Sequence, residues 1–408
     1  MNCGLLGRTL SHSYSPQIHS FLGDYAYDLF EKEPEEIADF LKNGDFTGIN
    51  VTIPYKKTVI PFLHALSPEA QKMGAVNTII RRPDGTLFGH NTDYYGFSSM
   101  LQHSLLSVSG KKVLVLGSGG ASNTAVEVLK EKGAQVVVIS RHGSDNYTNL
   151  CRHWDAAVIV NATPVGMYPH NGSSPINLSD FTRLEGVLDL IYNPARTRLL
   201  MDAEARGLVT ENGLWMLVAQ AKEAAEYFTG KRIEEHCISR IHQVLSRQMQ
   251  NIILIGMPGC GKSTVGRLLA EWCGKRFADA DQQIEVLAGK TIPEIFNADG
   301  EEVFRQWETA ALQQLGAQSG LVIATGGGCV TRERNYSHLH QNGTIVWLKR
   351  DISQLPTDGR PLSQSRKLSD LYSQRKPLYE AFSDLSVTNS SAPEDAADEI
   401  LKAWEEQP

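Results

Sequence analysis

The chain has 408 residues, which is enough for two or three domains that each bury a hydrophobic core. A formal net charge of −7 and 21% charged residues give no reason to expect nucleic acid or an anionic membrane as a partner. The six cysteines form no CxxC pair, which disfavours a zinc site and a disulfide framework and fits a reducing cytosol. We find no signal-peptide pattern and no apolar run long enough to span a bilayer, so the sequence predicts a cytoplasmic protein.

The first 250 residues alternate between apolar runs and amphipathic stretches, the pattern of an α/β fold. From residue 3 to about 100 this pattern predicts a parallel or mixed sheet with helices. From residue 111 the alternation is strict and predicts a doubly wound dinucleotide-binding fold. Strands are expected at 113–116, 135–139, 157–160 and 186–190, and long helices at 213–230 and 233–249.

A new strand, loop and helix begin at Asn251, which marks a second fold. We place the domain boundary near residues 245–250, at the polar end of a predicted helix. No Pro/Gly/Ser-rich tether is present there, so the linker is expected to be short.

A glycine-rich turn follows the strand at 113–116. Gly117-Ser118-Gly119-Gly120 leads into a predicted helix, whose N-terminus can hold a pyrophosphate. The next strand ends in Ser140-Arg141-His142, without the acidic residue that usually bonds the ribose of NAD. A guanidinium at this position favours a 2′-phosphate, and the sequence therefore predicts NADP. A tight structural turn and a solvated surface arginine are the alternatives.

A carbonyl that accepts a hydride also needs a proton donor beside it. Lys56 comes just after a predicted strand, and Asp93 stands at a predicted helix start. A lysine held partly desolvated against a carboxylate can polarise a ketone and deliver the proton. Taken singly, Lys56 also fits an ordinary surface lysine and Asp93 an ordinary helix N-cap.

Seven short motifs in the first 245 residues occur in a distinctive order. They are SHSYSP, NVTIPYK, GAVNT, NTDYYG, GSGGAS, NATPVGM and DLIYNP. As an ordered set they closely resemble shikimate dehydrogenase over about residues 2–245. The resemblance implies reduction of 3-dehydroshikimate to shikimate by NADPH. It also implies a substrate-binding lobe at 1–101, completed by helices at about 214–245, and an NADP-binding Rossmann lobe at 102–213.

The same resemblance assigns site residues, with Lys56 and Asp93 in the places of the catalytic pair. The substrate side comprises Ser13 and Ser15 for the carboxylate, Thr52, Asn77, Asp93 and Gln220 for the hydroxyls and ring, and Tyr192 as the closing wall. The NADP side comprises Gly117, Gly119, Gly120, Ala121, Ser140, Arg141, Thr163 and Gly213. Residues 140–142 depart from the Asn-Arg-Thr that is frequent in the family, so a second basic contact to the 2′-phosphate is not evident.

The segment 256–263, GMPGCGKS, meets the full G-x-x-x-x-G-K-[ST] rule between a predicted strand and an amphipathic helix. In such a loop the backbone amides cradle phosphate, Lys262 reaches the β/γ oxygens, and Ser263 offers its hydroxyl to Mg²⁺. The sequence therefore predicts an ATP or GTP site. Its contacts are expected from Gly259, Cys260, Gly261, Lys262, Ser263 and Thr264.

Phosphoryl transfer also needs an acceptor-positioning group, a metal-side carboxylate and cations. Asp279 and Asp281 end a predicted strand, and their spacing predicts both carboxylates on one side of that strand. Arg305 is expected on a helix, and the glycines 326–328 at the end of a buried strand, where the backbone can approach a ligand closely. Further cations are Arg360 and Arg375; a surface salt bridge is the alternative for each arginine.

The ordered set GMPGCGKST, DAD, GEEVFR, ATGGG, GRPL and RKPLYE resembles shikimate kinase over about residues 250–408. The resemblance implies transfer of the γ-phosphoryl of ATP to the 3-hydroxyl of shikimate. Asp281 would then activate the hydroxyl, and Asp279 would support Mg²⁺ through water. The remaining assignments are Arg305 and Arg375 for the carboxylate, Gly326, Gly327 and Gly328 for the pocket wall, and Arg360 on a mobile lid. The segment 351–359 is shorter than the usual lid region, and an adenine-stacking arginine is not evident.

The motifs thus favour a bifunctional enzyme acting on small-molecule substrates, with two alternatives. The first domain could prefer quinate with NAD, against which Ser13, Ser15 and Arg141 argue. A non-catalytic metabolite sensor built from the same domains would be expected to lack the predicted catalytic residues, and these are present. The oligomeric state is left open.

Overall fold

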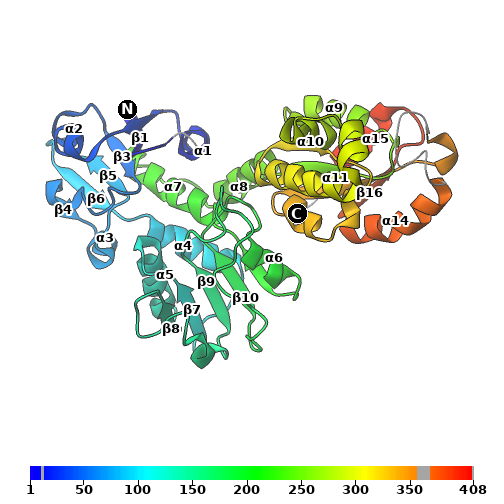
Figure 1. Cartoon of the computed structure of the whole chain (residues 1–408). Helices are drawn as coiled ribbons and strands as arrows, with labels where there is room; N and C mark the ends of the chain where they lie inside the picture. Colours follow the sequence, from blue (N-terminus) through cyan, green and yellow to red (C-terminus); the bar gives the residue numbers. More distant parts are fainter. Residues whose placement is uncertain (11–12, 356–367, 407–408) are drawn as a thin grey trace. The chain divides into compact units, whose positions relative to one another are not determined.

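The computed structural model describes residues 1–10, 13–355 and 368–406, and the chain forms two compact units. Unit 1 comprises Met1–Val165, Ser174–Tyr192 and Asp202–Leu245. Unit 2 comprises Gly166–Ser173, Asn193–Met201 and Ser246–Pro408. The chain passes from one unit to the other at five points, two of which lie within helices, α6 (Arg198–Glu204) and α8 (His236–Met249). The expected α/β architecture is confirmed, with three separate sheets (Figure 1).

The first sheet of unit 1 is mixed, with the strand order β2-β1-β3-β5-β6-β4. Strands β1, β2 and β3 run parallel, whereas β5 is antiparallel to both β3 and β6. The strands are β1 (Asn2–Gly7), β2 (Ala26–Glu31), β3 (Gly48–Val51), β4 (Ala65–Leu66), β5 (Thr78–Arg81) and β6 (Leu87–His90). The helical segments of this region are α1 (Ser15–Leu22), η1 (Pro34–Glu36), α2 (Ile37–Asn43), η2 (Ile60–Phe62) and α3 (Pro68–Met73).

The second sheet of unit 1 is entirely parallel, with the order β11-β10-β9-β7-β8. Its strands are β7 (Lys112–Leu116), β8 (Gln135–Ile139), β9 (Val158–Asn161), β10 (Gly186–Asp189) and β11 (Val209–Glu211). The accompanying helices are α4 (Asp93–His103), α5 (Gly120–Glu131), η3 (Leu150–His153) and α7 (Leu214–Thr229). Strand order reverses at β7, which lies between β8 and β9, so a ligand crevice is expected at its carboxyl end.

Helices α4 and α7 pack side by side in unit 1 (Figure 1). Helix α7 also contacts β3 and β5 of the mixed sheet, whereas α4 contacts α5 of the parallel layer. The pair therefore connects the two sheets and brings the first residue of α4 close to the mixed sheet.

Unit 2 is built on a parallel sheet with the order β13-β14-β12-β15-β16. Its strands are β12 (Asn251–Ile255), β13 (Arg276–Asp279), β14 (Leu321–Ala324), β15 (Gly343–Lys349) and β16 (Leu385–Thr388). The helical segments are α9 (Lys262–Trp272), α10 (Ala280–Ala288), α11 (Ile292–Ala317), η4 (Cys329–Thr331), α12 (Arg334–His340), η5 (Ile352–Gln354), α14 (Leu368–Phe382) and α15 (Pro393–Glu405).

The central strands of unit 2 are continuous apolar runs, buried on both faces as a covered parallel sheet requires. Strand order reverses at β12, between β14 and β15. The carboxyl ends of β12, β13 and β14 therefore meet at one edge, and each of these strands is followed by a segment singled out in the sequence. Within the described part of the chain, no helix is long and apolar enough to cross a membrane.

Candidate active sites

A cavity of about 450 Å³ opens in unit 1 beside the start of α4. It gathers side chains from segments far apart in the sequence. The predicted residues that line it are Ser13, Ser15, Thr52, Lys56, Asn77, Asp93, Ala121, Tyr192, Gly213 and Gln220. The fold thus brings together all the side chains expected around the substrate.

Lys56 and Asp93 form an ion pair in this cavity, with the lysine Nζ 2.6 Å from Asp93 Oδ2. Asp93 is the first residue of α4, where the positive end of the helix favours a carboxylate. Its second oxygen accepts a hydrogen bond of 3.0 Å from Asn77 Nδ2. The carboxylate is therefore held on two sides and fixes the lysine ammonium at the cavity wall.

Thr92 connects this pair to the neighbouring helix α7. The Thr92 amide donates to Asn77 Oδ1 over 2.8 Å, and its hydroxyl donates to Gln220 Oε1 over 3.3 Å. Thr92 is fully buried, so these bonds are shielded from water. Thr92 was not among the predicted site residues, although it lies inside the NTDYYG motif.

The glycine-rich turn of unit 1 packs closely against the segment that follows β9. Gly117 has a φ of 110°, and a Cβ there would lie 3.0 Å from the Ala162 carbonyl oxygen and 3.1 Å from Thr163 Cγ2. Only glycine fits this close approach without strain. The turn ends at Gly119, the N-cap of α5, which leaves the first amides of the helix for an anion.

Two further residues expected on the NADP side follow β8. Ser140 is partly buried, and its amide donates to the Asp145 carbonyl. Arg141 is exposed, and none of the carboxylates in the described residues forms an ion pair with it. Its guanidinium is therefore available to a ligand.

A second cavity, of about 590 Å³, lies at the carboxyl edge of the unit 2 sheet. The predicted residues that line it are Gly259, Gly261, Lys262, Ser263, Thr264, Asp279, Asp281, Arg305, Gly326, Gly327, Gly328 and Arg375. Cys260 does not line the cavity, because its side chain is fully buried beneath the loop. Arg360 lies outside the described residues.

The phosphate loop has a backbone that side chains could hardly adopt. Gly256, Gly259 and Gly261 have φ values of 141°, 84° and 103°. Lys262 Nζ donates to the carbonyl oxygens of Gly256 and Met257, at 2.9 and 3.0 Å. The lysine is thus held against its own loop, and the loop conformation fits a bound chain of phosphates.

Asp279 and Asp281 are arranged differently from the prediction that both end a strand. Asp279 ends β13 and serves as the N-cap of α10, whereas Asp281 lies in the first turn of that helix. Asp279 Oδ1 accepts a hydrogen bond of 3.0 Å from the Asp281 amide. The prediction of strand geometry was wrong because this capping bond starts a helix at Ala280. Both carboxylates nevertheless line the same cavity.

Ser263 and Asp279 offer a pair of oxygens that fit Mg²⁺. The serine hydroxyl donates to Asp279 Oδ2 over 2.9 Å. Mg²⁺ takes hard oxygen ligands and is usually bound by one or two carboxylates together with substrate phosphates. The donor set and its place beside the phosphate loop agree with that preference.

The three glycines after β14 lie against other site residues. A Cβ on Gly326 would lie 2.8 Å from Glu308 Oε1 and 3.2 Å from Asp281 Oδ1. A Cβ on Gly327 would press on the Pro258 ring, and one on Gly328 would collide with the Arg305 guanidinium. Each glycine is therefore required by close approach of its neighbours.

Glu308 is a site residue that the sequence analysis missed. It is fully buried and lines the cavity, and its Oε2 accepts a hydrogen bond of 2.7 Å from Arg305 Nη1. Its Oε1 has no hydrogen-bond partner among the described residues. The spacing in the sequence could have indicated it, because Glu308 follows Arg305 by three residues and therefore lies on the same face of α11.

Asp281 is the carboxyl whose ionisation the cavity changes most clearly. Burial raises its pKa from the ordinary 3.8 to about 6, and the nearby carboxylates of Asp279 and Glu308 add to the rise. Since the folded-state pKa lies above that of the unfolded chain, ionisation of Asp281 costs stability. Its contribution to stability therefore falls as the pH rises from about 4 to about 6.

We expect a ¹³C NMR titration of the ligand-free protein, labelled at the aspartate carboxyls, to show Asp281 titrating near pH 6. Asp281→Asn identifies the signal by removing it. Asp279→Asn is expected to lower the midpoint, because it removes a like charge. An unchanged midpoint in Asp279→Asn would contradict this electrostatic explanation.

Two family models match the chain. The model described as the shikimate dehydrogenase substrate binding domain matches residues 5–79, and the shikimate kinase model matches residues 258–405. Among curated proteins, the shikimate dehydrogenase (NADP(+)) of Clostridium perfringens (strain SM101 / Type A) is 35% identical over 264 residues. That match covers 59% of this chain and 97% of the relative.

Solved structures similar to this chain include two different dehydrogenases. Shikimate dehydrogenase 1 from Peptoclostridium difficile is 38% identical with a TM-score of 0.55, and the match covers 60% of this chain and 97% of that one. Quinate dehydrogenase from Corynebacterium glutamicum, solved with NAD, is 28% identical with a TM-score of 0.55, covering 60% and 98%.

Proposed function

Because the chain belongs to the shikimate dehydrogenase family and continues into a shikimate kinase domain, we propose that it performs two consecutive reactions. Unit 1 reduces 3-dehydroshikimate to shikimate with NADPH, through a substrate lobe at 1–101 and an NADP lobe at 102–213, apart from segments 166–173 and 193–201, which belong to unit 2. Unit 2 transfers the γ-phosphoryl of ATP to the 3-hydroxyl of shikimate. The observation that carries the proposal is that each unit has a polar cavity holding its expected catalytic carboxylate, Asp93 in one and Asp281 in the other.

In unit 1, NADPH when bound supplies the hydride that reduces the 3-ketone. Lys56 donates a proton to the ketone oxygen, and the ion pair of 2.6 Å with Asp93 holds the lysine side chain at the cavity. Ser13 and Ser15 bind the substrate carboxylate, while Asn77 and Gln220 orient the hydroxyls. The network through Thr92 limits their motion, which keeps the ring in one orientation.

In unit 2, Asp281 accepts the hydrogen of the 3-hydroxyl as that oxygen attacks the γ-phosphorus. Arg305 and Arg375 hold the carboxylate of shikimate, and the glycines 326–328 leave room for its ring. Lys262 turns from its loop carbonyls to the phosphates when ATP enters. Ser263 and, through a water molecule, Asp279 would hold Mg²⁺, which would supply positive charge beside the phosphates.

Arg141 supplies the preference for NADP. Arg141→Ala is expected to raise the KM for NADPH by about tenfold to a hundredfold, because it removes a charge-assisted contact to the 2′-phosphate. The KM for NADH, which lacks that phosphate, should stay nearly unchanged. His142→Ala is the matched control at the neighbouring exposed position. Equal KM changes for the two nucleotides would contradict the assigned role.

Mass spectrometry of the products tests the whole proposal. Purified protein is incubated with 3-dehydroshikimate, NADPH, ATP and Mg²⁺, and shikimate 3-phosphate is expected as the end product. In the Lys262→Ala variant the two reactions should stop after the first, with shikimate as the end product. Unchanged 3-dehydroshikimate would overturn the dehydrogenase assignment. The likeness to a quinate dehydrogenase solved with NAD then makes oxidation of quinate by NAD the next assay.

A further inference from the structure

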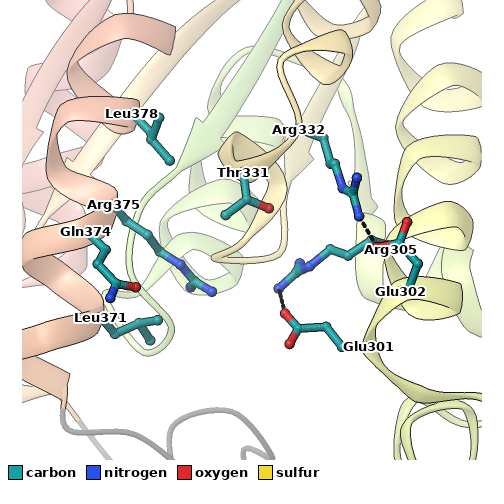
Figure 2. A pocket seen from close by; sticks show the side chains of 9 residues that line it. All are labelled: Glu301, Glu302, Arg305, Thr331, Arg332, Leu371, Gln374, Arg375 and Leu378. Atoms are coloured by element: carbon teal, nitrogen blue, oxygen red, sulfur yellow. Dashed lines mark hydrogen bonds and ion pairs between the residues drawn. The ribbon is translucent and has the colours of Figure 1, made fainter.

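A further cavity, of about 520 Å³, lies on another side of Arg305 and Arg375 in unit 2. Figure 2 shows its two walls, with Gln374 and Arg375 on α14 facing Arg305 and Glu301 on α11. Both arginines also line the cavity that holds Asp281. Their guanidinium groups therefore stand where the two cavities meet.

The two arginines differ in how their charges are balanced. Arg375 Nη1 donates to the Gly327 carbonyl oxygen over 3.0 Å, and no described carboxylate forms an ion pair with this side chain. Arg305, in contrast, has carboxylates on both terminal nitrogens: Glu308 on Nη1 and Glu301 on Nη2. A substrate carboxylate therefore meets Arg375 without a carboxylate partner among the described residues, whereas Arg305 already has two.

The two partners of Arg305 are not equivalent. The Glu308 side chain is 0% exposed and 2.7 Å from the guanidinium, so it cannot leave without burying an unpaired charge. The Glu301 side chain is 45% exposed and 3.2 Å away, so its carboxylate can turn to water at little cost. Glu301 also follows Gly300, where a φ of 82° interrupts α11, and it therefore starts a new helical segment.

We propose that Glu301 is a competing counter-ion that occupies Arg305 Nη2 until the carboxylate of the acceptor substrate displaces it. The inference rests on the proposed kinase function, in which Arg305 binds that carboxylate. The incoming group meets the unpaired Arg375 first and then takes the place of Glu301 on Arg305. Glu308 stays in place throughout and keeps the guanidinium plane fixed.

The exchange makes Glu301 a determinant of specificity for anionic acceptors. A carboxylate can replace the glutamate with little change in the charge around Arg305. A neutral acceptor cannot, because it would leave the Glu301 pair intact or the guanidinium unpaired. Glu301 thus lowers the affinity for carboxylate substrates, and it keeps other small anions from a buried guanidinium.

Kinase kinetics of the full chain test the proposal. Glu301→Gln is expected to lower the KM for shikimate about threefold at saturating ATP, with kcat unchanged, because the competing charge is gone. The KM for the neutral methyl ester of shikimate should not fall. An unchanged KM for ATP shows that the variant is folded.

Glu302→Gln is the matched control, since the neighbouring Glu302 forms an ion pair with Arg332 instead of Arg305 (Figure 2). Its KM for shikimate should equal that of the unchanged protein. A raised or unaltered KM in Glu301→Gln overturns the proposal and makes Glu301 a support for Arg305. If the unchanged protein does not phosphorylate shikimate at all, the kinase assignment itself has failed.

Discussion

Replacing Lys56 by methionine is expected to lower kcat for the reduction of 3-dehydroshikimate about 10²- to 10⁴-fold. Methionine keeps the length of the side chain but cannot deliver a proton to the ketone oxygen. The Lys56–Asp93 pair belongs wholly to unit 1, so phosphorylation of added shikimate by the same protein should keep its rate. Loss of NADPH absorbance follows the first reaction, and mass spectrometry of shikimate 3-phosphate follows the second.

Lys57→Met is the control for this experiment, because Lys57 is the adjacent lysine and its side chain is exposed. Asp93→Asn gives an independent test, since it keeps the shape of the side chain but removes the charge that holds Lys56 at 2.6 Å. It too should slow the reduction strongly. A loss of less than about tenfold in Lys56→Met would mean that another group donates the proton.

The buried strands of this protein could be predicted closely from the sequence. The run expected at 113–116 lies within β7 (Lys112–Leu116), and the strand expected from Asn251 is β12. Parallel strands covered on both faces read as continuous apolar runs, and glycine turns mark their ends. Lys56 and Asp93 were expected to act as a lysine held against a carboxylate, and they form an ion pair of 2.6 Å.

Hydrogen bonds between a side chain and the backbone account for the main errors. Asp281 was expected at the end of a strand, but α10 begins at Ala280, where the Asp281 amide donates a capping hydrogen bond to the Asp279 carboxylate. The helix expected from residue 233 begins at His236, because the Ile233 amide donates to the Glu226 carboxylate and leaves the chain unwound there. Such bonds depend on distances that apolar periodicity does not encode.

Long-range packing is a second reason why parts of the fold and of the site could not be predicted from the sequence. Segments 166–173 and 193–201 pack as part of unit 2, although their sequence neighbours belong to unit 1. Arg350 follows β15 and lines the same cavity as Asp281, yet no motif distinguishes it from a surface arginine. These assignments require the tertiary contacts themselves.

Removing the Glu308 carboxylate is expected to destabilise unit 2 by about 3 kcal/mol. Glu308→Ala leaves Arg305, which is 4% exposed, without its buried partner and opens a space beside Gly326. The exposed Glu301 still balances part of the charge, which places the loss at the low end of the range for a broken buried pair. In calorimetry, the transition that ATP shifts upward should move down by roughly 6–12 °C.

Glu308→Gln separates charge from packing. Glutamine fills the same space and can still accept a hydrogen bond from Arg305, so it should restore most, but not all, of the lost stability. Glu302→Gln, on the exposed side of the same helix, should leave the stability unchanged. If Glu308→Gln were as stable as the unchanged protein, the negative charge of Glu308 would contribute nothing to stability. Burial raises the pKa of Glu308 above its ordinary value, and the Arg305 guanidinium opposes that rise. The unpartnered Oε1, near Asp281, would in that case contribute only its volume to the site.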